Sequence, residues 1–353
     1  MEVPLLDLKA QYESLRDAIE PAVLQVMESQ QYINGPAVRE LEAKIAASCG
    51  CAEGVGVSSG TDALLCSMLA LDVGRGDEVI TTPYTFFATA GSIWRTGARP
   101  VFVDIEYDTF NLDVSQVEAA ITPRTRAVMP VHLFGQCVDM DPLMAVAEKR
   151  GLAVIEDACQ AIGATYKRNR AGSMGTTGCF SFYPTKNLNG IGDGGMIVTQ
   201  DAGLAERLRA FRNHGGLKTY RHEWVGGNFR LDTVQAAALL VKLPHVDEWA
   251  ERRRTNAARY DELFAACEHV VTPTVRDQNE SVFNQYVIRV PKRDELRDYL
   301  AQRGVGTKVY YPLSLHEQEC FTELGYKRGD FPESERAAGE TLALPIYPEL
   351  RPE

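Results

Sequence analysis

The sequence has no apolar run of the roughly 20 residues that a membrane-spanning helix requires, so we expect no membrane association. Residues 1–7 contain no basic segment followed by an apolar one, so we expect no signal peptide. The eight cysteines are scattered, with neither a CxxC pair nor a Cys/His cluster at zinc spacing. We therefore expect a cytoplasmic protein with reduced thiols and no metal site.

Positive charge is also scarce relative to negative charge. The chain has 37 Lys and Arg residues against 48 Asp and Glu residues, for a net charge of −11. This balance argues against an extended face for the nucleic-acid backbone, and we expect no nucleic-acid partner. A local basic pocket for one small anion remains compatible with it. The length of 353 residues, with 45% hydrophobic residues, suffices for one large domain and a smaller one.

Short apolar runs alternate with helical patterns through the first two thirds of the chain. The predicted strands are 54–58, 78–82, 100–104, 127–131, 153–156, 179–182 and 196–199. The predicted helices between them include 61–71, 114–120 and 141–150. Strands that are apolar almost throughout are buried on both faces, and strand–helix alternation favours parallel pairing. The pattern therefore predicts an α/β fold with a mostly parallel seven-stranded sheet between helices.

The pattern changes near residue 235, where a smaller α+β unit begins. We predict helices at 234–243, 249–267 and 294–303, and strands at 270–272, 286–290 and 307–311. Before the first strand, an amphipathic helix at about 8–28 must pack on the small domain or on a partner chain. The expected domains are an N-terminal arm (1–35), a large domain (36–240) and a small C-terminal domain (241–353).

Lys186 is the most informative residue of the sequence. It is the only charged residue in the aromatic and apolar run 180–187, and it precedes the glycine-rich segment 190–195. Loss of water lowers the pKa of a lysine, and a neutral amine forms a Schiff base with an aldehyde. With Ser181 five residues earlier, the segment indicates an aldehyde cofactor that carries a phosphate. By itself the segment fits an exposed turn lysine at least as well.

Two further loops offer a phosphate site and an aromatic platform. In the segment 58–62, Gly60 and Thr61 open a predicted helix, whose N-terminal N–H groups bind anions. The alternative is an ordinary helix cap. Phe86, on the loop after a predicted strand, is placed to stack on a pyridine ring, although packing in the core is the commoner role of an aromatic residue.

Asp157 ends a predicted buried strand, where a carboxylate needs a partner. A protonated pyridine nitrogen is such a partner, and Gln160 is close enough in sequence to reach the ring hydroxyl. A helix cap is the alternative for Asp157. The glycines of 190–195 do not form a dinucleotide fingerprint, because they precede a strand and lack the GxGxxG spacing.

The order of these segments resembles that of the DegT/StrS-type sugar aminotransferases, which are fold-type I pyridoxal phosphate enzymes. The matching stretches are 4–8, 35–36, 59–64, 156–158, 181–187, 227–231, 311–312 and 344–348, so the resemblance covers almost the whole chain. It implies pyridoxal 5'-phosphate as the cofactor, Lys186 as its Schiff-base residue and Asp157 as the partner of its ring nitrogen.

The resemblance also implies the remaining cofactor contacts. Gln160 lies beside the ring hydroxyl, Phe86 stacks on the ring, and Gly60, Thr61 and Ser181 hold the phosphate. Asn228 matches an asparagine that reaches the cofactor of the neighbouring subunit. The implied assembly is a homodimer with a shared active site.

Substrate contacts are implied for Arg230, Tyr311 and His316, although an exposed loop residue is an equal alternative for His316. Tyr310 stands where many members have histidine, which weakens an analogy to uronic-acid substrates. Members usually continue beyond the position of Glu353 into a final helix, which is a further difference.

The expected reaction moves an amino group from L-glutamate to the keto-sugar of a nucleotide diphosphate sugar, with a 3-keto sugar favoured. A cyclitol (inosose) aminotransferase is an alternative. A dehydratase using the same cofactor is disfavoured, because those relatives replace the lysine by histidine. A non-catalytic regulator that binds the cofactor is the third alternative, and the acidic charge argues against one that binds DNA.

Overall fold

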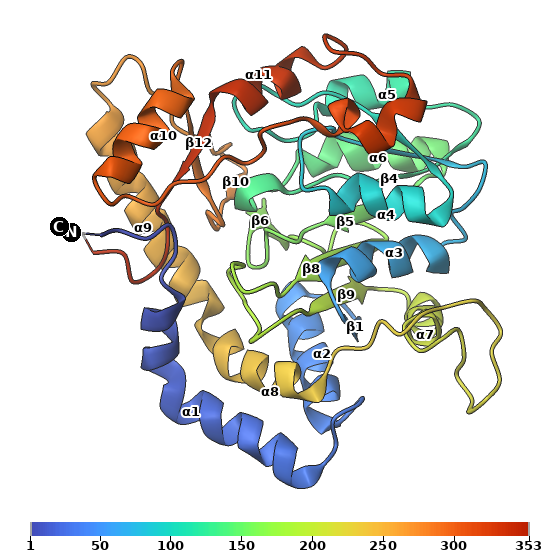
Figure 1. The fold of residues 1–353 in the computed structure, drawn as a ribbon. Coiled ribbons are helices and arrows are strands. Elements are labelled where there is room, and N and C mark those ends of the chain that lie inside the picture. The colour runs from blue at the N-terminus through green and yellow to red at the C-terminus, as the bar shows by residue number, and fades with distance from the viewer. Residues whose placement is uncertain (1, 352–353) are drawn as a thin grey trace.

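The computed structural model describes residues 2–351 and contains a central seven-stranded sheet (Figure 1). The strand order is β1-β9-β8-β5-β4-β2-β3. The strands are β1 (Glu53–Val57), β2 (Glu78–Thr81), β3 (Arg99–Phe102), β4 (Thr125–Val128), β5 (Ala153–Asp157), β8 (Thr177–Ser181) and β9 (Gly195–Thr199). Strand β9 is antiparallel to both neighbours, and the other pairs are parallel. The predicted sheet is therefore confirmed.

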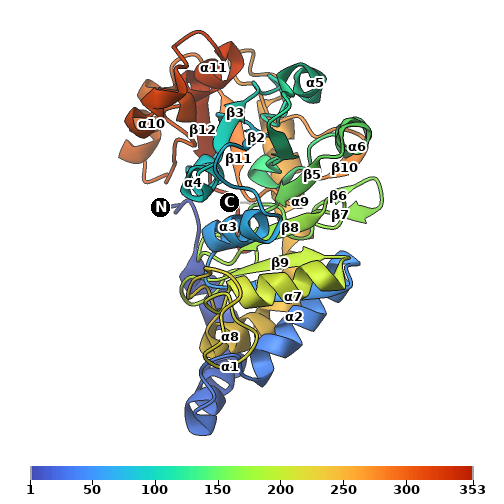
Figure 2. The ribbon, with the colours of Figure 1, turned by 90° about the vertical axis from the view of Figure 1, so that its right-hand side faces the viewer.

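Helices cover both faces of the sheet, and neighbouring strand residues alternate between the two cores (Figure 2). Val154 and Phe180 belong to one core, whereas Ile155 and Cys179 belong to the other. The first core includes residues of α2 (Pro36–Cys49), α5 (Val117–Ala120), α6 (Met140–Arg150) and α8 (Thr233–Lys242). The second includes residues of α3 (Gly60–Ala70), α4 (Ala88–Thr96) and α7 (Ala202–Phe211). Burial on both faces explains why the strands are apolar throughout.

Side chains cover the free edge of β1. Gly56 donates its N–H to Glu42 Oε1 at 2.8 Å, and Arg212 Nη1 donates to the Gly56 carbonyl oxygen at 2.8 Å. Arg212 also donates to Glu42, so the buried ion pair satisfies both polar groups of Gly56. Helix α2 lies so close that a Cβ at Gly54 would be 2.4 Å from the Glu42 carbonyl oxygen. The glycines of β1 therefore admit the helix to the strand edge.

At the opposite edge of the sheet, β3 is covered in the same way. Phe102 donates its N–H to the Tyr326 hydroxyl at 3.2 Å, and Arg99 donates to the carbonyl of Leu324. Both edge strands thus have side-chain or backbone partners from elsewhere in the chain.

We expect Glu42→Ala to lower the free energy of unfolding by about 3 kcal/mol, because it leaves Arg212 buried without its carboxylate. Chemical unfolding of the two proteins side by side measures the difference. Glu118→Ala is the matched control, since Glu118 pairs with exposed Lys149 and Arg150 and is expected to matter by less than about 1 kcal/mol. Equal losses in the two variants would contradict a special role for the buried pair.

The C-terminal part begins with the long helix α9 (Val246–Phe264) and contains α10 (Arg293–Gln302), α11 (Pro332–Glu340) and a two-stranded sheet of β11 (Tyr286–Arg289) and β12 (Thr341–Leu344). The predicted strands 270–272 and 307–311 are wrong in extent: each makes a single bridge, through Val271 and Lys308. Pro273 and Pro312 follow these segments and have no N–H for a longer ladder.

The remaining elements are short. A three-stranded sheet contains β10 (Asn279–Glu280), β6 (Thr165–Tyr166) and β7 (Asn169–Arg170). The 3-10 helices are η1 (Val114–Gln116), η2 (Leu133–Gly135), η3 (Leu243–His245), η4 (Leu315–Glu317) and η5 (Glu319–Leu324).

The predicted domain boundary at residue 240 falls inside α8, and the domain limits stay predictions. Residue 1 of the arm and residues 352–353 of the small domain lie outside the described part.

The N-terminal arm contacts both parts of its own chain. Val3 forms a parallel bridge with Val305, and α1 (Leu8–Ser29) runs beside α8 (Figure 1). Asp7 caps α1 by accepting from the N–H groups of Lys9 and Ala10. The apolar side chains of Leu24, Met27 and Ile33 remain 50–54% exposed.

None of the helices within residues 2–351 combines the length and apolarity needed to cross a bilayer.

Candidate active site

Four loops meet at the carboxyl edge of the sheet. They follow the parallel strands β1, β2, β5 and β8, whose ends lie at the same edge. Thr89, after β2, donates to Asp157 at the end of β5 at 2.8 Å. A Cβ on Gly60, after β1, would lie 2.7 Å from Ser181 Cβ and 2.8 Å from Cys159 Sγ. The structure thus brings together the segments that carry the predicted cofactor contacts.

Lys186 is half-buried among these loops. Burial lowers the pKa of its amine, while the nearby Cys159 and Asp157 oppose that shift. Within residues 2–351, no carboxylate forms an ion pair with the amine. The geometry therefore favours a reactive amine over the exposed turn lysine considered above.

The turn that carries Lys186 is braced by side chains from other elements. Lys242, at the end of α8, donates to the carbonyl oxygen of Asn189 at 3.0 Å and to its Oδ1 at 2.8 Å. Asn189 Nδ2 in turn donates to the Pro184 carbonyl at 2.9 Å, and Asn187 Nδ2 donates to the Val282 carbonyl at 2.9 Å. Burial lowers the pKa of Lys242 to about 8. This network fixes the backbone on both sides of Lys186.

Asp157 is 5% exposed and accepts two hydrogen bonds. Its Oδ2 accepts from Thr89 Oγ1 at 2.8 Å, and its Oδ1 accepts from the Cys159 N–H at 3.3 Å. Turns rather than a helix follow the residue, so the helix-cap alternative does not hold. A buried carboxylate with one long hydrogen bond retains lone pairs for a further donor.

The N-terminus of α3 offers the expected anion site. Ser59 is the cap and accepts from the Asp62 N–H at 3.0 Å, so the capping alternative is correct for this residue. The N–H groups of Gly60 and Thr61 lie in the first turn, where no intrahelical acceptor exists, at the positive end of the helix dipole. Ser181 lies directly beside Gly60. The cap therefore leaves the N–H groups of Gly60 and Thr61 available, and their role as an anion site stays a prediction.

Phe86 and Gln160 both lie next to Tyr311. The Phe86 ring is 57% exposed and 6.3 Å from the Tyr311 ring, so core packing does not account for it. Gln160 accepts from the Phe134 N–H at 2.8 Å and donates to the Tyr311 hydroxyl at 3.0 Å. Gln160 thus fixes Tyr311, a contact that the sequence does not indicate, and its contact with a ring hydroxyl stays a prediction.

The remaining predicted residues, Asn228, Arg230 and His316, differ in their exposure and in their hydrogen-bond partners. Asn228 is exposed, in a segment that crosses the end of β1, where the Ser58 N–H donates to the Phe229 carbonyl at 2.9 Å. Arg230 donates to Asn213 Oδ1 at 2.8 Å. His316 is 4% exposed, with Nε2 at 3.1 Å from Glu335, so it is not the exposed loop residue of the alternative. The cofactor role of Asn228 and the substrate roles of Arg230 and His316 stay predictions.

Thr85, Thr89 and Cys159 are site residues that the sequence reasoning missed. Thr85 and Thr89 lie 3.0 Å apart through their hydroxyls, and Cys159 adjoins Lys186. Their closeness in sequence to Phe86 and Asp157 was the available signal.

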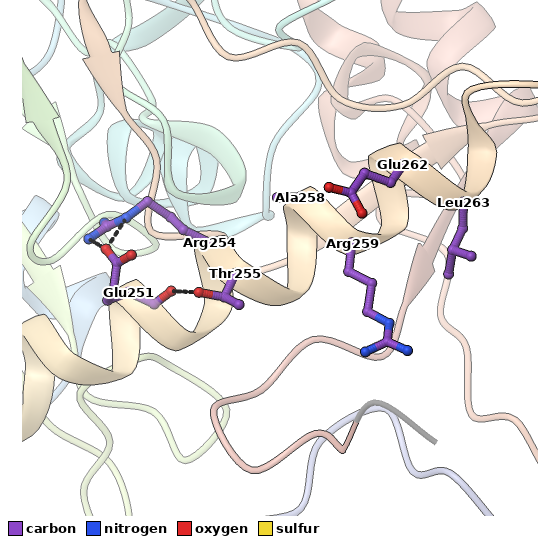
Figure 3. A pocket seen from close by; sticks show the side chains of 7 residues that line it. All are labelled: Glu251, Arg254, Thr255, Ala258, Arg259, Glu262 and Leu263. Atoms are coloured by element: carbon purple, nitrogen blue, oxygen red, sulfur yellow. Dashed lines mark hydrogen bonds and ion pairs between the residues drawn. The ribbon is translucent and has the colours of Figure 1, made fainter.

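A surface depression of about 710 Å³ lies along α9 (Figure 3). Its residues come from a different segment of the chain than the four converging loops. One face of that helix lines it, with Glu251, Arg254, Thr255, Ala258, Arg259, Glu262 and Leu263. Arg254 is already paired with Glu251. None of these residues belongs to the four converging loops, so the depression does not compete with them as a catalytic centre.

The chain is similar in sequence to known aminotransferases. The sequence model of the DegT/DnrJ/EryC1/StrS aminotransferase family matches residues 13–353. A protein named pleiotropic regulatory protein, from Geobacillus stearothermophilus, is 53% identical over 355 residues, which is 100% of this chain and 95% of that one. A UDP-N-acetyl-3-dehydro-alpha-D-glucosamine 3-aminotransferase from Acidithiobacillus ferrooxidans is 42% identical over 351 residues, or 99% and 94% of the two chains.

Solved structures agree as well. DesV of S. venezuelae, in complex with a ketimine intermediate, superposes with a TM-score of 0.97 at 43% identity and covers 99% of this chain and 95% of its own. NtdA of Bacillus subtilis, with bound PMP, gives a TM-score of 0.90 at 29% identity over 98% and 81% of the chains. The chain belongs to the DegT/DnrJ/EryC1/StrS aminotransferase family, as its motifs predict.

Proposed function

We propose that this aminotransferase uses pyridoxal 5'-phosphate (PLP) to move an amino group from L-glutamate to a 3-keto sugar of a nucleotide diphosphate sugar. The observation that carries the proposal is the meeting of Lys186, whose pKa burial lowers, with the Asp157 carboxylate and the N-terminus of α3. The name of the Acidithiobacillus relative, a 3-aminotransferase of a UDP-linked 3-dehydro sugar, supports the sugar class and the position.

The residues present fit PLP at its aldehyde, its phosphate and its ring nitrogen. The amine of Lys186 suits its aldehyde, and the free N–H groups of Gly60 and Thr61 with the Ser181 hydroxyl suit its phosphate. The available lone pairs of Asp157 suit a protonated ring nitrogen, and the exposed Phe86 ring offers a stacking face. A Cβ at Gly60 would fill the space between Ser181 and Cys159, which explains the glycine. When bound, PLP supplies an electron sink for carbanion chemistry.

Lys186 has two tasks in the proposed mechanism. Its amine would hold the aldehyde of PLP. As the neutral base it would take the proton from the α-carbon of L-glutamate in the first half-reaction, and as the protonated acid it would deliver a proton to the sugar carbon that receives the amino group in the second. Because burial lowers its pKa, a larger fraction of Lys186 is neutral near pH 7 than for an exposed lysine. The Asp157 carboxylate would accept a hydrogen bond from the ring nitrogen of bound PLP and would favour its protonated form.

A homodimer with a shared site is part of the proposal. Asn228 is exposed at the end of β1, where a second chain can approach it. The exposed apolar side chains of Leu24, Met27 and Ile33 provide a surface on the arm that favours association.

The relative named as a regulatory protein favours one competing function, a cofactor-binding regulator without turnover. The two functions differ in their response to an amino donor. We expect purified protein with PLP to absorb in the visible range, to bleach with L-glutamate, and to recover on addition of a UDP-linked 3-keto sugar. UDP-N-acetylglucosamine, which lacks the ketone, is the matched control and should not restore the band. A coloured protein that responds to no amino donor would support the regulator instead.

A further inference from the structure

Two threonine hydroxyls and the carboxylate of Asp157 form a buried line at the start of α4. Thr85, Thr89 and Asp157 are 2%, 1% and 5% exposed. The oxygens of Thr85 and Thr89 are 3.0 Å apart, and Thr89 Oγ1 is 2.8 Å from Asp157 Oδ2. All three side chains are therefore withdrawn from bulk water, where their polar atoms depend on one another.

The number of available protons determines which group donates in each of these two hydrogen bonds. An ionised carboxylate only accepts, so the single hydroxyl proton of Thr89 is donated to Asp157. Thr89 can then only accept from Thr85, so Thr85 is the donor in their contact. Both hydroxyl dipoles point toward the carboxylate and stabilise its negative charge.

The same contact makes the two carboxylate oxygens unequal. Oδ2 receives the short bond from Thr89, whereas Oδ1 receives only the 3.3 Å bond from the Cys159 N–H. Thr89 itself is held by its N–H, which donates to the Phe86 carbonyl at 3.2 Å. One turn of chain therefore positions both the aromatic platform and the carboxylate.

We infer that Thr85 and Thr89 form a chain of hydroxyl donors that orients the Asp157 carboxylate through Oδ2 and leaves a lone pair of Oδ1 available for the ring nitrogen of the cofactor. Thr89 is a positioning residue, since it acts through Asp157. The inference rests on the proposed function, because PLP is the group that Oδ1 receives. Without these hydroxyls, the buried charge loses its strongest donor, and the proton on the ring nitrogen is held less firmly.

The test compares Thr89→Val, which removes the hydroxyl at nearly constant shape, with Thr89→Ser, which keeps it. Apo-protein is titrated with PLP, and the visible spectrum of the loaded protein is followed against pH. We expect Thr89→Val to bind PLP about tenfold more weakly, as for one hydrogen bond to a charged group. The pH dependence of its visible band should change, and kcat should fall about tenfold at an unchanged KM for L-glutamate. Thr89→Ser should stay within about threefold of wild type.

Thr96→Val is the matched control on the same helix. Thr96 donates to the Ile93 carbonyl at 2.8 Å at the far end of α4, so its loss should leave PLP affinity and spectrum unchanged. If Thr89→Val does not fold, Thr85→Val removes the outer hydroxyl and should shift the same quantities in the same direction by about threefold, as expected for a bond between neutral groups.

The outcomes distinguish failure of the threonine inference from failure of the proposed function. Wild-type PLP affinity and spectrum in Thr89→Val, or in Thr85→Val if that variant is used, would overturn the threonine inference even if the thermal midpoint fell, because only a structural role would remain. A wild-type chain that binds PLP and transaminates in that same experiment leaves the proposed function intact. A wild-type chain that binds no PLP overturns both.

Discussion

Lys186→Ala is expected to lower the rate of transamination by about a thousandfold or more and to abolish the visible absorbance of the bound cofactor. The substitution removes both the amine that holds the aldehyde and the base that moves the proton, and general acid–base catalysis alone contributes about 10²–10⁴-fold. Steady-state turnover of L-glutamate with a UDP-linked 3-keto sugar, measured together with the absorbance spectrum, provides both readouts.

Two control variants distinguish loss of the reactive amine from loss of positive charge and from a general effect of losing a lysine. Lys186→Arg keeps a cation of similar length without a nucleophilic amine, and should be as inactive as the alanine variant. Lys149→Ala removes an exposed lysine that pairs with Glu118, and should behave as wild type. A Lys186→Ala protein that turns over at the wild-type rate would remove Lys186 from the mechanism.

Asp157→Asn is expected to reduce kcat by about 10²–10³-fold, because an amide of the same shape carries no charge to hold a proton on the ring nitrogen. The visible band of the bound cofactor should also change its pH dependence, since the charge that opposes loss of the ring proton is gone. Turnover and an absorbance titration of the loaded protein measure the two effects.

The control for Asp157→Asn is Asp139→Asn. Asp139 is a half-buried carboxylate that accepts from the Tyr166 hydroxyl at 2.6 Å, outside the four converging loops. Its amide variant should retain near-wild-type kcat. If Asp157→Asn retained both the kcat and the titration of wild type, the ring nitrogen would need another partner.

The sheet was predictable from local sequence because its strands are buried on both faces and therefore apolar throughout. Asp157 ends β5 and Lys186 lies in the turn after β8, and a parallel sheet brings the carboxyl ends of both strands to one edge. The predicted strand at 307–311 was wrong in extent because only Lys308 of this segment pairs, in a long-range bridge with Ala343 that the local sequence does not indicate.

The finer contacts of the site depend on tertiary structure. Thr89 and Asp157 are 68 residues apart in sequence, and nothing in either segment indicates their hydrogen bond. Gln160 reaches Tyr311 across 151 residues. The burial of His316 likewise depends on Glu335 and on the ring of Phe331, 4.8 Å away. Sequence patterns identify the faces of elements, whereas these pairings require the assembled fold.

The closed edges of the sheet limit how two copies of the chain can associate. An uncovered edge strand is a template for strand addition and for amyloid-like growth. Here the polar groups of Gly56 are occupied by Glu42 and Arg212, and the N–H of Phe102 is occupied by Tyr326. Strand addition is thereby disfavoured at these positions of the two edge strands, so loss of Glu42 would free the N–H of Gly56 for pairing as well as destabilise the chain.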